Sequence, residues 1–429
     1  MKIRTVDKSY EDVLKLPKKP HQKPKKQWGF LRWILKPLCF VLLKLSGFTG
    51  YKKKGMEKLG KGEPCLVLMN HSSFIDLEIV AFLLGDRAYH IVTTLDAFVG
   101  LSWILRLVGC IPTKKFINDV NLVRDMRYTL KELKESVVMY PEASYSFDGT
   151  ATPLPDSLGK CLKLLGVPVV VIRTEGAFLR EPLYNCLQHR KVKLSATMEY
   201  LLSPEDIKSK SVEELNEILA ESFDFDHFKT QQEKGILVTE PYRADGLHRV
   251  LYKCPHCQTE GQTVGKGVHL TCNACGVKYE LTESGFLQAV SGETLINHIP
   301  DWYRWERECV KKELEAGTYK LDVDVDICML VDTKCVYRVG SGHLVHTKEG
   351  FHLTGCNGLL DYKQSPHSSY GLYSDFYWYE IGDMICVGDE KVQYYCFPKN
   401  AGNVVAKTRM AAEELYKMLR KLSKAKREI

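Results

Sequence analysis

The stretch Cys65-Leu-Val-Leu-Met-Asn-His71-Ser-Ser-Phe-Ile-Asp76 begins as an uninterrupted apolar run and turns polar just before a histidine. Such a run predicts a buried strand, and the apolar residues Phe74 to Leu84 predict a helix directly after it. Ligands and catalytic groups in α/β folds gather at the carboxyl ends of strands, which is where His71 is expected. The stretch therefore favours an α/β domain with a functional group at the edge of its sheet.

His71 and Asp76 form the candidate catalytic pair. If the helix begins at Ser72 or Ser73, His71 lies just outside it and Asp76 lies in its first turn, so the carboxylate can reach back to the imidazole. A histidine held by aspartate at one nitrogen can act as a general base through the other. The second interpretation is structural, because Ser73-Phe-Ile-Asp76 resembles a capping box with Asp in place of Glu or Gln.

Strand and helix patterns continue to alternate from about residue 64 to residue 200. Val137–Tyr140 and Val167–Ile172 are short apolar runs that predict strands, and Leu158–Leu165 between them predicts a helix. This alternation is typical of an α/β domain.

Three more blocks follow the His71 block in order. They are Gly109-Cys-Ile-Pro-Thr-Lys-Lys-Phe116, Val138-Met-Tyr-Pro-Glu-Ala-Ser-Tyr-Ser146 and Gly166-Val-Pro-Val-Val-Val171. In this order and spacing, the four blocks resemble the glycerophospholipid acyltransferases, specifically the 1-acyl-glycerol-3-phosphate acyltransferase family. The resemblance spans about residues 28–205.

The resemblance implies a reaction and roles for its residues. His71 is the general base that deprotonates the acceptor hydroxyl, and Asp76 orients it. The alkoxide attacks the thioester of acyl-CoA or acyl-carrier-protein without a covalent acyl-enzyme. The resemblance also implies six substrate-binding positions, at some of which this chain has the family's residue and at others a different one. These positions are Lys114, Lys115, Glu142, Ser144, Tyr145 and Pro168. Glu142 matches a glutamate that helps bind the acceptor, Lys115 or Lys114 falls at a phosphate-binding arginine, and Pro168 matches a block that lines the acyl pocket.

One departure from the family bears on the acceptor. The family has Glu-Gly-Thr-Arg-Ser where this chain has Glu142-Ala-Ser-Tyr-Ser146, so Tyr145 stands in place of an arginine. Lysine does not replace the bidentate grip of arginine on phosphate. The candidates are therefore 1-acylglycerol-3-phosphate, a lysophospholipid with a larger headgroup and another lipid hydroxyl. The alternative class is a catalytically weak lipid-binding adaptor.

Two cysteine pairs form the second strong motif. Cys254-Pro-His-Cys257 and Cys272-Asn-Ala-Cys275 are separated by fourteen residues, a pattern typical of a zinc ribbon. Four thiolates leave no open position, so a structural Zn²⁺ is expected at Cys254, Cys257, Cys272 and Cys275, with His256 solvated. A pair of redox dithiols is the alternative. The ribbon has few arginines and no aromatic–basic interleaving, so nucleic acid is not an expected partner.

The amino-terminal segment predicts contact with a membrane surface. Residues 1–60 hold sixteen Lys or Arg against four Asp or Glu. Residues 28–50 are apolar and aromatic, but Arg32, Lys36 and Lys44 interrupt them, so they lack the roughly 20 apolar residues that cross a bilayer. We expect a helix lying in the interface of an anionic leaflet, or alternatively a buried amphipathic helix.

The whole chain has 429 residues, of which 45% are hydrophobic and 26% charged, and this excludes a disordered, fibrous or polytopic membrane protein. Fifteen cysteines, mostly single in apolar runs, and no recognisable signal peptide favour a cytoplasmic, peripheral (monotopic) protein on the inner face of the membrane. The expected fold is an α/β acyltransferase domain, a small zinc ribbon and a mostly β, pleckstrin-homology-like or GRAM-like barrel closed by a helix. The expected parts are a basic flexible arm (1–27), an interfacial segment (28–50), the acyltransferase domain (51–245), the ribbon (250–290), a linker helix (295–317) and the barrel (318–425).

Overall fold

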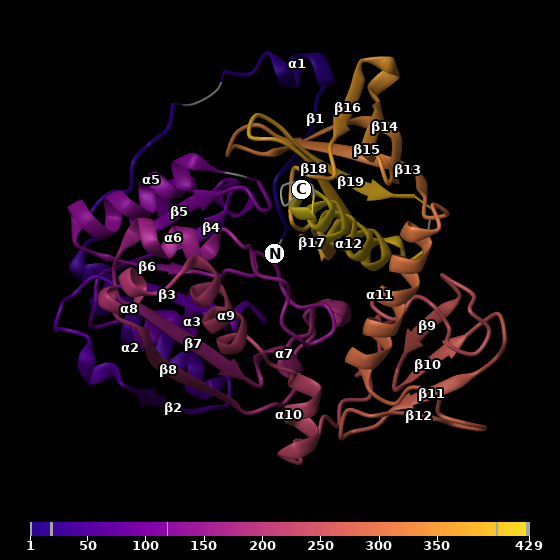
Figure 1. Ribbon diagram of the computed structural model, residues 1–429, viewed down its shortest axis with the longest axis horizontal. Coiled ribbons are helices and arrows are strands. Elements are labelled where there is room, and N and C mark those ends of the chain that lie inside the picture. Colours follow the sequence, from indigo (N-terminus) through magenta and orange to yellow (C-terminus); the bar gives the residue numbers. More distant parts are fainter. Residues whose placement is uncertain (1, 18–19, 118, 400–401, 426–429) are drawn as a thin grey trace.

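The computed structural model describes residues 2–17, 20–117, 119–399 and 402–425. Its first part is a seven-stranded sheet of order β2-β8-β7-β3-β6-β4-β5, in which only β7 and β8 are antiparallel neighbours (Figure 1). The strands are β2 (Phe48–Lys54), β3 (Leu66–Met69), β4 (Tyr89–Thr94), β5 (Cys110–Thr113), β6 (Ser136–Met139), β7 (Val169–Glu175) and β8 (Leu194–Leu202). The α/β prediction is confirmed.

Helices cover both faces of this sheet because its central strands are apolar on both sides. One face packs against α2 (Gly29–Leu45) and α3 (Ile75–Leu83), and the other against α5 (Val120–Tyr128), α6 (Leu158–Leu165) and α9 (Val212–Ser222). The shorter helices of this part are α4 (Ser102–Leu107), α7 (Ala177–Arg180), α8 (Pro204–Ser209) and α10 (His227–Glu233). Among the described residues, no helix is both long and apolar enough to cross a membrane.

A four-stranded antiparallel sheet of order β12-β11-β10-β9 follows. Its strands are β9 (Thr263–Lys266), β10 (His269–Cys272), β11 (Lys278–Leu281) and β12 (Leu287–Ala289). The helix α11 (Ile299–Glu315) then leads to the last part of the chain.

The carboxyl-terminal part is a largely antiparallel sheet of order β16-β15-β14-β13-β19-β18-β17. Its strands are β13 (Leu321–Leu330), β14 (Val336–Thr347), β15 (Gly350–Gly355), β16 (Leu360–Gln364), β17 (Tyr373–Trp378), β18 (Gly382–Gly388) and β19 (Gln393–Pro398). The final helix α12 (Val404–Ala425) packs against β17 and β18. Within the described chain, β16 and β17 end the sheet without pairing with each other, so the predicted closed barrel is not formed.

The amino-terminal arm is partly built into this last sheet. β1 (Thr5–Asp7) pairs in parallel with Val336–Arg338 of β14, and α1 (Tyr10–Leu14) buries Val13. On β14, β15 pairs with the later residues Gly342–Thr347, which leaves the edge at Val336–Arg338 for β1. The prediction of a flexible arm over 1–27 is therefore wrong for residues 5–14, because an open strand edge supplies hydrogen bonds that composition does not reveal.

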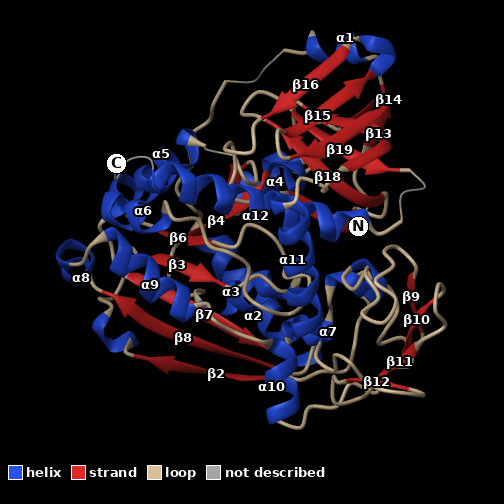
Figure 2. Ribbon diagram, turned by 45° about the vertical axis from the view of Figure 1, so that its right-hand side comes forward, coloured by secondary structure: helices blue, strands red, loops and turns tan. Residues whose placement is uncertain are grey.

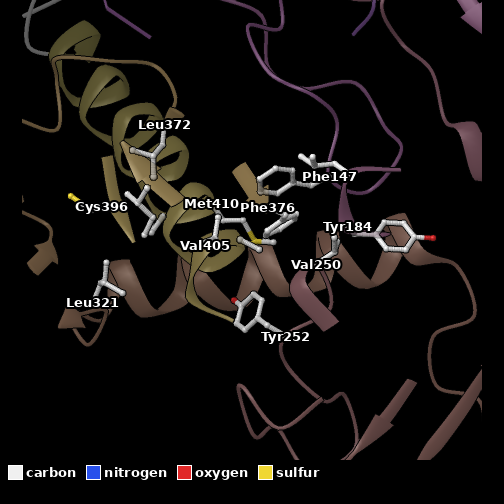
Figure 3. Packing of buried hydrophobic residues seen from close by; sticks show 14 of the residues in the cluster. Phe147, Tyr184, Val250, Tyr252, Leu321, Leu372, Phe376, Cys396, Val405 and Met410 are labelled. Atoms are coloured by element: carbon white, nitrogen blue, oxygen red, sulfur yellow. The ribbon is translucent and has the colours of Figure 1, made fainter. Parts of the chain in front are cut away.

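One hydrophobic core joins the three parts of the molecule, which surround α11 and α12 (Figure 2). It contains Phe147 of the first part, Tyr252 next to the small sheet, and Phe376 and Met410 of the last part (Figure 3). The rings of Phe147 and Phe376 stack with centroids 4.3 Å apart. The surfaces of the first and last parts that face each other at these rings are therefore buried from water.

Candidate active site

His71 and Asp76 lie at the carboxyl end of β3, as predicted. Nδ1 of His71 is 3.2 Å from Oδ2 of Asp76, and the same oxygen accepts the backbone N–H groups of Ser72 at 2.8 Å and Ser73 at 3.1 Å. The Asp76 carboxylate therefore does both things that the sequence suggested: it contacts the imidazole of His71 and it caps the backbone at the start of α3. Because a carboxylate accepts, Nδ1 carries the proton, and Nε2 keeps the lone pair of a base.

The imidazole of His71 lies between two tyrosine rings. Its centroid is 4.2 Å from that of Tyr140 and 4.1 Å from that of Tyr145, with both ring pairs tilted by about 30°. Burial lowers the pKa of His71, and Lys115 adds to this effect, while Asp76 partly opposes it. The histidine is therefore neutral at pH 7, as a general base must be.

Glu142 is buried next to His71 and accepts a hydrogen bond from its backbone N–H. Oε2 accepts the N–H of His71 at 3.1 Å, and Oε1 accepts the N–H and the hydroxyl of Thr152 at 2.9 and 3.2 Å. Burial raises the pKa of Glu142 to about 7, while these hydrogen bonds oppose the shift. Both oxygens face the protein interior, so this geometry gives Glu142 a positioning role in place of the predicted contact with the acceptor.

Ala143, the next residue, has a φ of +57°, in the left-handed region. The family's block has glycine at this position, and glycine adopts such a conformation without a Cβ clash. Alanine is strained here by about 1–2 kcal/mol, which the surrounding hydrogen bonds must offset.

His71 opens into a cavity of about 1410 Å³. Lys114, Lys115 and Tyr145 line the same cavity, as predicted. Parallel strands place these groups together, because β3, β5 and β6 all end at this edge of the sheet. The Nζ of Lys115 lies 4.4 Å from the ring centre of Tyr373, and Lys114 donates to the carbonyl of Glu390.

Two predicted substrate-binding residues lie elsewhere. Pro168 immediately precedes β7, and its carbonyl accepts the N–H of Leu66, so it sits at the opposite edge of the sheet from His71. The expectation that Pro168 lines the acyl pocket is therefore corrected. Ser144 is buried, and its hydroxyl accepts a hydrogen bond from Arg409 at 2.8 Å, outside the cavity.

The cavity instead has an apolar arm between β4, β6, α5 and α6. The residues that line this arm are Ile91, Val92, Leu122, Val123, Met126, Met139, Leu158 and Cys161. They belong to the helix-covered interior of the first part, where a hydrocarbon chain would be shielded from water.

Arg409 of α12 is a site residue that the sequence did not indicate. Its guanidinium donates to Ser144, pairs with Glu413 at 3.1 Å and lies 4.3 Å from the ring centre of Phe147. It thereby holds the loop that carries Tyr145 onto His71. No local pattern could have revealed this contact, which spans 265 residues of sequence.

Asn70 and the strand β17 are two further parts of the site that the sequence analysis did not predict. Asn70 is buried, and its side chain bonds the backbone and hydroxyl of Thr174, which joins the ends of β3 and β7. Asn70 directly precedes His71 in a polar turn, a signal that was open to sequence reasoning. β17 contributes Tyr373, Asp375 and Trp378 to the cavity wall, which only the assembly of the two parts could reveal.

The four predicted cysteines form a cluster in the small sheet. Their sulfur atoms all lie within 4.8 Å of one another, with Cys254–Cys275 and Cys257–Cys272 each at 3.7 Å. Thiolates around a tetrahedral zinc at about 2.3 Å would be about 3.8 Å apart. The cluster can therefore hold a metal ion such as zinc, while His256 is engaged with the hydroxyl of Tyr279 at 2.8 Å.

Comparison with known proteins agrees with this geometry. The family model described as Acyltransferase matches residues 50–175, the region that contains all four sequence blocks in full. This region is therefore similar to an acyltransferase domain. A curated relative, the chloroplastic 1-acyl-sn-glycerol-3-phosphate acyltransferase BAT2 of Brassica napus, is 27% identical over 139 residues, which are 31% of this chain and 40% of the relative. The match thus spans less than half the length of that relative.

A solved structure of the family also resembles the chain. The crystal structure of the 1-acyl-sn-glycerophosphate acyltransferase PlsC of Thermotoga maritima shares 18% identity with a TM-score of 0.36 and covers 45% of this chain and 77% of its own. The cysteine cluster and the carboxyl-terminal sheet lie outside the region matched by the family model.

We expect Glu142→Gln to lower kcat by about 10²-fold, because an amide nitrogen would face a backbone N–H and displace His71 from its working position. The KM for the acceptor should change little, since Glu142 does not line the cavity. Steady-state kinetics with varied acceptor measures both values. Glu205→Gln, an exposed glutamate on α8 that does not line the cavity, is the matched control. A raised KM with an unchanged kcat would restore the acceptor-binding role.

We also expect one tightly bound zinc per chain, measured by elemental analysis of freshly purified protein. Cys272→Ser should remove the metal and unfold the small sheet, because metal binding supplies much of the folding free energy of such sites. Cys309→Ser, outside the cluster, should retain it. Stoichiometric zinc in the Cys272→Ser protein would contradict the assignment.

Proposed function

We propose that this protein transfers a fatty acyl group from an acyl thioester to the hydroxyl of a lysophospholipid. The observation that carries the proposal is the neutral His71, held at Nδ1 by Asp76, at the wall of a large cavity with an apolar arm. This combination provides a base for the hydroxyl and a sheltered volume for the acyl chain.

The reaction begins when Nε2 of His71 takes the proton of the acceptor hydroxyl. The resulting alkoxide attacks the thioester carbonyl, the C–S bond breaks as the ester C–O bond forms, and the thiolate leaves with the proton from the imidazolium. Asp76 stabilises the imidazolium between these steps, and the tyrosine rings keep the imidazole in place. Acyl-CoA and acyl-carrier-protein both provide such a thioester.

We infer a structural role for the metal. Four cysteines complete a tetrahedral Zn²⁺ shell and leave no position for substrate, and none of them lines the cavity. The zinc would maintain the small sheet, against which the start of α11 packs through Tyr279 and Trp302.

We further infer that α2 lies in the interface of an anionic membrane leaflet, on the inner face of the membrane. Its exposed apolar side chains include Phe30 (65% exposed), Trp33 (75%) and Leu45 (80%). α2 packs against α3, and the exposed Phe74 and Leu77 at the start of α3 line the cavity. An apolar surface that continues to the cavity would deliver a lysolipid without passage through water.

The experiment that tests the function is transfer of a radiolabelled acyl group to a panel of lysolipids. We expect His71→Ala to lower kcat by about 10²–10⁴-fold, the usual contribution of a general base, and Asp76→Asn to lower it less. His352→Ala, on the exposed face of the last sheet, is the matched control. Wild-type turnover in folded His71→Ala protein would refute the assignment, and lipid binding without any turnover would favour the adaptor.

We expect the double variant Phe30→Ala, Trp33→Ala to bind anionic vesicles at least tenfold more weakly, because each exposed ring contributes on the order of 1–2 kcal/mol when it enters the interface. Binding of the unaltered protein should weaken as salt rises. Vesicle sedimentation measures both effects, and Leu359→Ala, an exposed apolar residue beside β16, is the control. Unchanged sedimentation of the double variant would place the membrane contact elsewhere.

A further inference from the structure

The wall of the cavity opposite the first part is made by β17 and the turn that follows it. Tyr373, Asp375 and Trp378 belong to the strand, and Tyr379 follows directly. The matched acyltransferase region ends at residue 175, so this wall is an addition to the family's domain. The headgroup of an acceptor whose hydroxyl reaches His71 would face these residues.

The wall carries more negative than positive charge. Lys115 lies near two carboxylates, Asp96 and Asp375; burial lowers the pKa of Lys115, while both carboxylates act to raise it. Asp96 is also satisfied by other groups, since it accepts the Tyr373 hydroxyl at 2.6 Å and the Trp378 indole N–H at 3.2 Å. The ammonium of Lys115 thus faces two carboxylates, and Arg409 also acts on it.

Asp375 is the member of this group with an unsatisfied carboxylate oxygen. Its Oδ1 is buried and has no hydrogen-bond partner among the described residues. Burial and the nearby Asp96 raise the pKa of Asp375 to about 7, although Lys115 opposes the shift. A buried carboxylate of this kind gains stability from a further positive charge.

Aromatic rings surround this carboxylate within the cavity. Tyr145, Tyr373, Trp378 and Tyr379 line the cavity around it. Tyr377 and Tyr379 have φ values of +53° and +45°, a left-handed conformation that is strained for residues with a Cβ and that gathers at functional sites. Aromatic faces beside a carboxylate are the established chemistry for binding an ammonium group.

The same cavity is poorly suited to a dianionic phosphate. Lys114 is engaged with the carbonyl of Glu390, and Lys115 is balanced by the two carboxylates. The charged residues that line the cavity are six acidic and four basic. Tyr145 occupies the position of the family's arginine and stacks on His71, so it supplies no charge.

We propose that the cavity selects an acceptor whose headgroup ends in an ammonium group, with Asp375 as its counter-ion and the tyrosine and tryptophan rings of the β17 wall around it. The proposal rests on the proposed function and names the acceptor class of that same site. Asp375 is then a specificity-determining residue.

Binding of matched single-chain probes below their micellar concentrations tests this without turnover. The probes are dodecylphosphocholine, dodecylphosphoethanolamine and dodecyl phosphate, titrated calorimetrically into the full-length protein. We expect at least one of the two ammonium probes to bind more tightly than dodecyl phosphate. Asp375→Asn should weaken that probe about tenfold or more and dodecyl phosphate less than twofold. Tyr379→Leu, which removes a ring and leaves the carboxylate, should act in the same direction.

The control is Asp361→Asn, an exposed carboxylate on β16 of the same sheet, which should change no affinity. Tighter binding of dodecyl phosphate by the unaltered protein, or an equal loss for all three probes in Asp375→Asn, overturns the proposal. The ratio of kcat/KM for lysophosphatidylcholine, lysophosphatidylethanolamine and lysophosphatidic acid then distinguishes quaternary from primary amines. An effect of Asp375→Asn on the KM of the acyl thioester alone also overturns it. Selective binding without transfer to any lysolipid would instead defeat the proposed function and leave the headgroup site standing.

Discussion

The buried guanidinium of Arg409 ties the last helix of the chain to the loop that places Tyr145 on His71. A buried charge is tolerated only when it is paired and fully hydrogen-bonded, and Arg409 meets this condition through Glu413 and Ser144. Burial acts to raise the pKa of Glu413, but Arg307 and Arg409 outweigh burial and lower this pKa, so the pairing keeps the Glu413 carboxylate charged. The order of the catalytic loop therefore depends on a helix that the acyltransferase family model does not include.

The shared hydrophobic core has the same consequence on a larger scale. Phe147 follows the loop of Tyr145 and stacks on Phe376 of β17, two residues before Trp378. Removing the carboxyl-terminal sheet would expose this ring and also remove one wall of the cavity. The carboxyl-terminal sheet is thus part of the cavity wall, whereas none of the four cysteines of the cluster lines the cavity.

The site uses burial in two opposite ways. Around His71, burial lowers the pKa and keeps the imidazole in its basic form. Around Asp375, burial raises the pKa and leaves a carboxylate that is short of positive charge. The proposed base and the proposed counter-ion for a cationic headgroup therefore share one desolvated volume.

The sequence by itself determined what depends on neighbours along the chain. A buried strand followed by a helix placed His71 and Asp76 within reach of each other, and two Cys-x2-Cys pairs placed four sulfurs on two turns, because short segments fix their geometry through local hydrogen bonds. The family resemblance of the block Gly109–Phe116 also pointed to Lys114 or Lys115 as a substrate-binding residue, and both line the cavity with His71.

Only the tertiary structure decided what depends on distant segments. In the structure, Glu142 bonds the backbone of His71, and Pro168 lies at the end of the sheet opposite His71. Thr5–Asp7 pairs with β14, and Arg409 and Asp375 lie at the site. Nor did alternating apolar residues reveal that the last sheet stays open. A hydrophobic pattern specifies that a face is buried, but the identity of the surface that covers it is settled by the packing of the whole chain.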